Sequence, residues 1–473
     1  MLRRGLLFAG TTALSACTAI GPDYQAPEIA LTPNWREPAS SSLSSAPAEL
    51  AQWWQKLGDP ELGALIERAL SQGLDVREAL ARVAEARALR GVAAADRLPT
   101  VDSSASYRLS GESDNTPLGG FVPDNGIFSV GLDASWELDL WGRVRRSIEA
   151  ADAELAAMLE GARDAHVMVA AEVALRYVEL RTFQRRLAIA RGNVDLQQET
   201  LGLVQGRLDA GLVGESDVAQ ARTNLASTRS RLPALEGGLR AAENRLCVLL
   251  GVAPGALASE LSNAAPIPVP PLAIAVGVPA DLLRRRADVR RAERALAAET
   301  ARIGVTEGDL YPRLALNGNL GLAAEELSDL TESASGAFGI GPSLRWNVFD
   351  SGRIRRRVAA QEARTEQALV TWERSVLLAL EEAENAMTSF VREQERRASL
   401  REAAEQARKA VELARAQYSE GLSDFQTVLV SERSLADLED ELATSDSAVT
   451  ASAVRLYKAL GGGWEEGAEP RGG

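Results

Sequence analysis

The chain is poor in cysteine, histidine and aromatic residues, and each shortage excludes a class of site. Its 473 residues include two cysteines and one histidine, and aromatic residues make up 5% of them. Two cysteines cannot form a disulfide framework. The histidine, His166, has no cysteine or second histidine nearby with which to bind a metal, and Cys247 is interpreted as a buried apolar residue on a helix. We therefore predict no metal site.

An excess of positive charge and the common catalytic motifs are missing too. The formal net charge is −14, whereas a surface that binds nucleic acid needs a basic stripe. The sequence contains no nucleophile elbow, metal-ligand cluster or phosphate-binding loop. We therefore expect no nucleic-acid partner, no catalytic residue and no cofactor other than a covalent lipid.

The apolar stretch at the start of the chain is too short to remain as a membrane span. Arg3 and Arg4 precede the apolar residues 5–13, and the run Leu-Ser-Ala-Cys follows at 14–17. This order is typical of a secretory signal peptide that ends in a lipobox. We predict a signal peptide over residues 1–16 and a lipid on Cys17, and Thr18 after it favours the outer membrane over the inner one. The alternative is a cleavable signal with an incidental cysteine.

The second half of the chain repeats the first half at a constant offset. Trp136 recurs as Trp346 and Gly142 as Gly352, an offset of 210 positions. The same offset relates Arg143 to Arg353, Arg145 to Arg355, Arg146 to Arg356, Gly211 to Gly421, Leu212 to Leu422, Val218 to Val428, Leu225 to Leu435, Arg245 to Arg455 and Gly251 to Gly461. This regularity indicates a duplication in which the lengths between motifs were kept, as rigid helices would require.

Each copy contains segments in which apolar and polar residues alternate. The clearest ones are residues 128–138 in the first copy and 338–348 in the second, and weaker ones precede them at 101–109 and 314–322. A period of two indicates β-strands. We predict four strands in two hairpins, with loops at roughly 111–126 and 323–337.

A sheet of four strands has two open edges, and a bilayer core does not tolerate open edges. Bacterial membrane barrels begin at about eight strands. The sheet is therefore either soluble with one wet face, or pooled with the sheets of other protomers in one closed barrel, and the lipobox favours the barrel. Trp136, Trp141 and Trp346 fall near strand ends, where they are either an aromatic girdle or core residues.

The rest of the sequence favours long helices. Alanine, leucine, arginine and glutamate dominate, and no proline interrupts residues 147–210 or 353–420. Some 64 helical residues would reach roughly 95 Å, which is too long for a compact domain. Apolar residues recur at heptad-like spacing, as at Val169, Val173, Leu180 and Leu187.

Each predicted long helix meets a glycine-containing turn, at 211–216 and at 421–424, after which a second helix returns. The sequence therefore predicts two antiparallel helical hairpins. Pro233 is expected to kink or interrupt the first returning helix, because proline lacks the N–H of a helix interior.

Several motifs make the chain resemble the TolC-like outer-membrane efflux family, in particular its lipoprotein members from tripartite RND-type systems. They cover nearly the whole chain: Cys17, Gly21-Pro22-Asp23-Tyr24 with Pro27, Trp53-Trp54 with Leu57, Asp59-Pro60 and Leu62, the run 283–290 with Ala287 where proline is usual, Leu310-Tyr311-Pro312, and the run 457–464 ending in Gly-Gly-Gly-Trp.

The resemblance implies a mainly α fold with a membrane β-barrel. Three protomers would pool four strands each into one twelve-stranded barrel, and their long helical hairpins would form a periplasmic α-barrel. In this family the hairpin tips dock onto a periplasmic adaptor, which couples the homotrimer to an inner-membrane RND transporter. By that likeness the adaptor-binding tips are Gly211, Leu212, Val213, Gly214 and Ser216 in the first copy and Gly421, Leu422 and Ser423 in the second.

The resemblance also implies a periplasmic gate beyond the second tip. Tyr418 matches a tyrosine often found beside that gate, but Thr427 and Val430 stand where relatives carry aspartates. The remaining candidates for negative charge at the gate are Asp217, Glu420 and Asp424.

The sequence thus predicts a lipid-anchored outer-membrane exit duct that passively conducts small molecules such as drugs or metal ions. The alternative is the outer-membrane channel of a type I protein secretion system. A periplasmic adaptor is disfavoured, because it would have one hairpin flanked by small β modules. The expected organisation is a signal peptide at 1–16, a lipidated segment at 17–50, a first repeat at 51–260 (strands about 100–139, hairpin about 143–251), a second repeat at 261–463 (strands about 313–350, hairpin about 353–461) and a tail at 464–473.

Overall fold

The computed structural model of the chain describes residues 19–30, 32–37, 42–44, 46, 49–111, 113, 115 and 124–464. The predicted signal peptide, Cys17, most of the loop between the first two strands and most of the predicted tail lie outside these residues. The chain divides into two compact units. The first comprises residues 1–28, 84–157 and 292–372, and the second comprises residues 29–83, 158–291 and 373–473.

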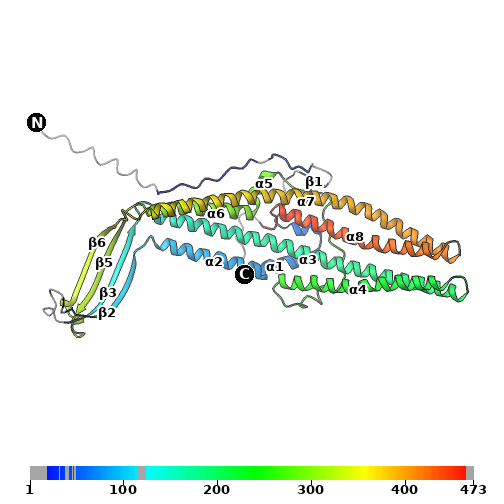
Figure 1. Cartoon of the computed structure of the whole chain (residues 1–473), viewed down its shortest axis with the longest axis horizontal. Coiled ribbons are helices and arrows are strands. Elements are labelled where there is room, and N and C mark those ends of the chain that lie inside the picture. The colour runs from blue at the N-terminus through cyan, green and yellow to red at the C-terminus, as the bar shows by residue number, and fades with distance from the viewer. Residues whose placement is uncertain are drawn as a thin grey trace. The chain divides into compact units, whose positions relative to one another are not determined.

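The first unit contains a four-stranded antiparallel sheet in the order β2-β3-β5-β6 (Figure 1). The strands are β2 (Thr100–Ser110), β3 (Asn125–Leu138), β5 (Arg313–Ala324) and β6 (Gly336–Arg345). The prediction of two strand hairpins is confirmed, and pairing of β3 with β5 joins the two hairpins into one sheet.

The last strand is shorter than the sequence pattern predicts, because β6 ends at Arg345 and leaves Trp346 and Val348 beyond it. In the first copy the equivalent residues 136–138 remain in β3, where they pair with residues 314–316 of β5. The matching side of β6 is an open sheet edge in a single chain. Residues 346–348 therefore lack the partner strand that holds their equivalents in the sheet.

Two helical hairpins are formed by helices of equal lengths in the two copies. Helices α3 (Arg143–Asp209) and α7 (Arg353–Ser419) have 67 residues each, and α4 (Glu215–Leu249) and α8 (Phe425–Ala459) have 35 each. This equality confirms the predicted hairpins and agrees with a duplication. Within the described ranges, no helix combines the length and apolar character that a membrane span requires.

Of the two outcomes predicted at Pro233, the break is wrong, since α4 continues through that residue, and the kink stays a prediction. Pro233 lies on the exposed side of the helix. A carbonyl freed by the proline ring on that side can bind water, so the helix loses one hydrogen bond without leaving a buried unpaired group.

The heptad-like residues of α3 are buried as predicted: Val169, Val173, Leu180 and Leu187 expose 4% of their surface or less. Cys247 is also fully buried, on α4. Leu187 packs with Ala190 of α3 and Leu235 of α4. The segment before the first repeat strands contains the short helix η1 (Trp53–Leu57), α1 (Pro60–Gln72) and α2 (Leu74–Ala95).

The motif around Trp53 anchors α1 in the second unit. The Trp53 ring stacks on Tyr457 of α8 with ring centroids 5.3 Å apart. Asp59 caps α1 by accepting the N–H of Leu62, and its other oxygen accepts the hydroxyl of Tyr177 at 2.8 Å. The motif is therefore structural, because it fixes α1 against α3 and α8.

The motif between the two repeats is structural as well. It covers the end of α5 (Pro279–Arg285) and the start of α6 (Ala287–Gly308). Before α5, the strand β4 (Ile274–Ala275) forms a two-residue parallel pairing with β1 (Leu43–Ser44). The buried Arg286 pairs with Asp288 and with Glu382, each at 2.7 Å, and it donates to the carbonyl of Ala459. These ion pairs lower the pKa of both Asp288 and Glu382, although burial acts in the opposite direction.

Candidate functional site

The turns that close the two hairpins have the same backbone geometry. Gly211 and Gly421 take φ values of 72° and 74°, which only glycine adopts at low cost. The next residue in each turn, Leu212 or Leu422, donates its N–H to the carbonyl of residue 207 or 417. This is the Schellman arrangement that ends a helix tightly. The local sequence therefore specifies both tips.

Two leucines and a valine near the tips expose much of their apolar side chains. Leu212 and Leu422 expose 64% and 78% of their surface, and Val430 on α8 exposes 55%. Val213 and Ser423 are half-buried, and Gly214 and Ser216 are exposed. The predicted tip residues therefore form two short surface turns, each with a leucine that is mostly exposed.

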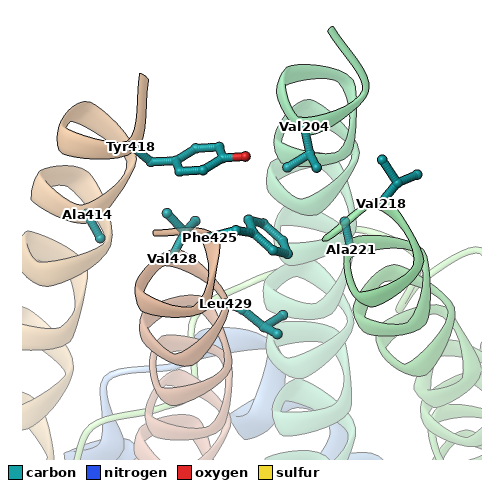
Figure 2. Close-up of a cluster of buried hydrophobic side chains, with 8 residues drawn as sticks. All are labelled: Val204, Val218, Ala221, Ala414, Tyr418, Phe425, Val428 and Leu429. Carbon is teal, nitrogen blue, oxygen red and sulfur yellow. The ribbon is translucent and has the colours of Figure 1, made fainter. Parts of the chain in front are cut away.

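Behind the tips, all four helices contribute to one buried apolar cluster, which Figure 2 shows. Its members are Val204 of α3, Val218 and Ala221 of α4, Ala414 and Tyr418 of α7, and Phe425, Val428 and Leu429 of α8. The rings of Tyr418 and Phe425 lie 5.7 Å apart. The two hairpins are thus packed together directly behind their turns.

Arg207 near the end of α3 makes a polar contact between the hairpins at this level. Its Nη1 donates to the carbonyl of Tyr418 at 2.6 Å and to that of Ser419 at 3.3 Å, both at the end of α7. Its guanidinium also lies 4.8 Å from the centre of the Tyr418 ring. A cation in this position interacts favourably with the helix dipole at the C-terminus of α7 and with the face of the aromatic ring. We call this contact the Arg207 latch.

Tyr418 itself is almost fully buried, and its hydroxyl has no hydrogen-bond partner among the described residues. Burial raises the pKa of this phenol. The predicted gate tyrosine is therefore part of the packed apolar cluster. Its hydroxyl could be satisfied by a bound water or by a different packing of the hairpins.

The three acidic residues predicted for the gate do not share one environment. Asp424 caps α8 by accepting the N–H and hydroxyl of Thr427, and these bonds lower the pKa of Asp424. Asp217 lies in the first turn of α4, where an acid is favoured by the helix dipole. Glu420 is exposed in the second turn. The chain does not bring these three carboxylates together into one cluster.

A buried acid that the sequence reasoning missed lies further from the tips. Glu432 of α8 exposes 2% of its surface and accepts the hydroxyl of Thr200 of α3 at 2.5 Å. Burial raises the pKa of its carboxyl, against smaller opposing effects of Thr200 and Arg415. Nothing local in the sequence marks this pair, because its members are in different hairpins.

The sheet of the first unit has one apolar face and one polar face. The apolar face is exposed in a single chain, with Phe338, Ile340 and Leu344 exposing 84%, 78% and 66% of their surface. On the other face Ser135 donates to Asn317 at 3.0 Å, and Asn317 donates to Ser343 at 2.6 Å. The alternation read from the sequence therefore separates the two faces as predicted.

Three tryptophans lie where the sheet meets the helices. The indole N–H of Trp136 donates to the carbonyl of Arg97, that of Trp141 to Pro312, and that of Trp346 to Leu310. All three side chains are exposed. They are therefore surface residues with satisfied N–H groups, and the alternative of a core position is wrong.

Across the described ranges, no three histidine, cysteine, aspartate or glutamate side chains are grouped so that they could hold a metal ion. His166 hydrogen-bonds through Nδ1 with the carbonyl of Ala162 on its own helix.

Comparison with known proteins gives these features a common context. The model of a family described as "Outer membrane efflux protein" matches residues 65–252 and again residues 278–462. The chain belongs to this family. The prediction of a TolC-like outer-membrane efflux protein with an internal repeat is thereby confirmed.

Two curated relatives cover almost the whole of this efflux protein. Nodulation protein T of Rhizobium leguminosarum bv. viciae is 32% identical over 451 residues, which are 95% of this chain and 92% of the relative. The pyoverdine export outer membrane protein OpmQ of Pseudomonas putida is 31% identical over 459 residues, with 96% of both chains covered.

A solved structure supports the fold independently. The outer-membrane channel OprN matches this efflux protein with a TM-score of 0.87 and 38% identity, over 94% of this chain and 99% of the other. OprN is a channel and OpmQ an export protein, and neither is described as an enzyme.

Proposed function

We propose that this efflux protein is the outer-membrane exit duct of a tripartite pump. It passively conducts small molecules that an inner-membrane RND transporter delivers through a periplasmic adaptor. The observation that carries the proposal is the sheet, which has one exposed apolar face, one polar face and two open edges. Export of a small molecule by the relative OpmQ supports the class of cargo.

An open edge at β2 and another at β6 argue for assembly. Unpaired backbone groups are not tolerated in hydrocarbon, so the edges must pair with another strand. Three copies, each contributing β2, β3, β5 and β6, would close one barrel with the apolar face toward lipid and the polar face toward the lumen.

The internal repeat supports one particular register for the pairing of β6 with β2 of a second copy. Ser135 pairs with Thr100, and its repeat equivalent Arg345 pairs with Arg313, so Thr100 and Arg313 occupy equivalent positions. Trp136 pairs with Leu316 across the β3–β5 boundary. By the same equivalence Trp346 would pair with Ser103 of a second copy.

This register keeps like residues together on each face. Leu344 would lie opposite Ala105, and Ile340 opposite Leu109, all on the apolar face. A shift by one residue would turn the apolar face of one strand toward the lumen. The same register gives residues 346–348 the partner strand that they lack in a single chain.

Cross-linking between copies tests both the barrel and its register. Cysteines at Ser343 and Ser106, which would be opposite on the polar face, should form disulfide-linked trimers in a Cys247→Ala background. The matched control keeps the cysteine at Ser343 and places the second one at Thr100 instead of Ser106. Thr100 is on the same face of β2 as Ser106 but about 20 Å away along the strand. Efficient cross-linking of the control pair, or of neither pair, would contradict the register.

We infer that the tips dock the adaptor through the exposed Leu212 and Leu422, and that the periplasmic gate lies at the Arg207 latch. Closed and open packings of the hairpins would be in equilibrium, and an adaptor that binds the open one more tightly would shift the population. The gate would thus rest on the latch and on Tyr418, with Asp217, Glu420 and Asp424 as surface charges around it.

The lipid anchor is part of the proposal. Cys17 is the last residue of the lipobox and lies outside the described residues, so support for acylation comes from the sequence. An acyl chain beside a barrel would add a second attachment to the outer membrane.

A further inference from the structure

A pocket of about 470 Å³ lies in the first unit, at the end of the sheet where β5 begins and α7 starts. It opens on the polar face of the sheet, beside Asn317 and Ser343. Four arginines line it, namely Arg313, Arg345, Arg353 and Arg357, together with two acids, Glu137 and Asp309. The pocket therefore has more positive than negative side chains.

Both acids of the pocket are already engaged. Glu137 accepts two bonds from Arg143, at 3.0 and 2.8 Å, and Asp309 forms an ion pair with Arg313. Arg353 and Arg357, by contrast, form no ion pair with any residue that the structure describes. Neither of these two guanidinium groups is thus held in an ion pair within the described chain.

The internal repeat provides a comparison for these arginines. In the first copy, Arg143 pairs with Glu137 at 2.8 Å and Arg145 pairs with Asp139 at 3.3 Å. At the 210-residue offset, Asn347 replaces Glu137 and Phe349 replaces Asp139. Asp350 caps α7 as Asp139 caps α3, since Ile354 and Val144 donate their N–H groups to these acids from equivalent positions. The second copy has therefore kept the arginines of the motif, lost the counterpart of Glu137 and moved the other acid by one position.

The second copy has also gained a charge. Arg357 corresponds to Ser147 of the first copy. Cations near a helix N-terminus are disfavoured by the helix dipole, by about 0.3–1 kcal/mol each. The nearby Asp350 accepts the N–H groups of Gly352 and Ile354 and also interacts electrostatically with Arg353, so it offsets part of the charge of Arg353. Arg357 has no ion-pair partner among the described residues, and folding alone gives no reason for its charge.

A second copy of the chain would neutralise only part of this charge. In the register argued above, its Asp102 comes opposite Asn347, beside Arg345 on the polar face. Arg345 then acquires an acidic neighbour, whereas Arg353 and Arg357 belong to helix α7 and not to the paired strands. The inference therefore rests on Arg353 and Arg357.

We propose that this pocket is an anion-binding subsite on the luminal face of the duct, which takes a carboxylate, phosphate or sulfate group of a molecule in transit. The proposal rests on the proposed function for one point, that the polar face lines the lumen. Two guanidinium groups suit such groups because each presents paired N–H donors to two oxygens. Three copies would form a basic ring, which favours anions as arginine rings do in anion pores.

A lipid headgroup carries the same phosphate chemistry but would have to reach the pocket from the other side of the sheet. The pocket is lined by the polar face, whereas the apolar face is opposite it. We therefore assign the anion to the lumen, and the experiment includes an arm for lipid.

The test compares two double variants in planar bilayers of zwitterionic phosphatidylcholine. Arg353→Gln with Arg357→Gln removes the pocket charges, and the matched control, Arg355→Gln with Arg356→Gln, removes equal charge from the same helix outside the pocket lining. Inorganic sulfate is the probe, read as block of the open-channel current and as the reversal potential in a salt gradient.

We expect the sulfate concentration for half-block to rise about tenfold in the pocket variant, and its anion permeability ratio to fall severalfold. The control should stay within about twofold of the parent protein. An unchanged pocket variant, or an equal change in the control, would overturn the subsite. Parent trimers that conduct normally without sulfate block would refute the subsite and leave the duct standing, whereas trimers that never conduct would refute the duct.

The lipid arm measures retention of phosphatidylglycerol by purified trimers. If the pocket variant loses that lipid while its sulfate block is unchanged, the arginines bind a headgroup and the luminal subsite is wrong. Equal retention by both variants, with the sulfate effect confined to the pocket variant, supports the subsite.

Discussion

Removal of the Arg207 latch should bias the channel toward its open state. Arg207 is the only side chain in the described chain that donates to the carbonyls of Tyr418 and Ser419 from the other hairpin. Arg207→Ala leaves the apolar cluster of Figure 2 in place, since none of its members is changed. The substitution therefore separates the polar contact from the packing.

The size of the effect follows from the three contacts that are lost. A hydrogen bond from a charged donor contributes about 1.5–3 kcal/mol, and the longer second bond adds less. The cation–π contact, at 4.8 Å from the ring centre, contributes about 0.5–2 kcal/mol depending on its hydration. A total of about 2–4 kcal/mol is expected, and at its lower bound this would change the ratio of open to closed tips roughly 30-fold.

Single-channel recording of the purified trimer measures this ratio directly. In the absence of the adaptor, the Arg207→Ala channel should have a much higher open probability than the parent channel. The matched control is Arg191→Ala, which breaks an ion pair with Glu236 at 3.1 Å within the first hairpin and spares all contacts between hairpins. An open probability that is unchanged by Arg207→Ala, or raised equally by Arg191→Ala, would refute the assignment of the latch to the gate.

Two further outcomes are expected. Burial raises the pKa of Glu432 above its ordinary value of 4.5, so its favourable contribution to folding is fully present below that value and is lost as pH rises through the folded-state pKa. Glu432→Gln should therefore have a higher Tm than the parent at pH 7, and the difference should disappear on acidification; a difference independent of pH would contradict this. Cys17→Ala should abolish incorporation of labelled palmitate, with normal trimer assembly as the control, and persistent labelling would exclude Cys17 as the lipid site.

Much of the fold could be predicted because its signals are local and occur twice. Period-two alternation located all four strands, and the lack of proline located α3 and α7 to within a few residues. The two tips could be predicted from their glycines, because a backbone position with positive φ strongly favours glycine. Pro233 shows the limit of such rules, since solvent on one side of α4 made an interior proline tolerable.

The site was harder to predict because its contacts join residues that are far apart in the chain. Arg207 and Tyr418 are separated by 211 positions, and Thr200 and Glu432 by 232. In a sequence of this composition, an arginine or glutamate in the middle of a helix is expected on the solvent-exposed face. Only the packing of one hairpin on the other reveals which of them are buried.

The duplication nevertheless contains a signal that is sharper than any single motif. Two copies of one unit should differ least where both have the same structural role. A charged residue that is present in only one copy can therefore point to a role that the other copy does not share. Arg207 corresponds to Gln417, and Glu137 to Asn347. The first of these differences is at the latch and the second is at the basic pocket.

The hydrogen-bond acceptors of the latch could not be recognised in the sequence. Its acceptors are the carbonyls at the end of α7, and every helix ends in carbonyls that lack a partner within the helix. A change of one side chain, at position 207, is then enough to fasten one hairpin to the other. Because these acceptors are backbone groups, substitutions in α7 that keep Tyr418 and the C-terminal turn should leave the latch intact, whereas loss of the Tyr418 ring should remove only the cation–π contact.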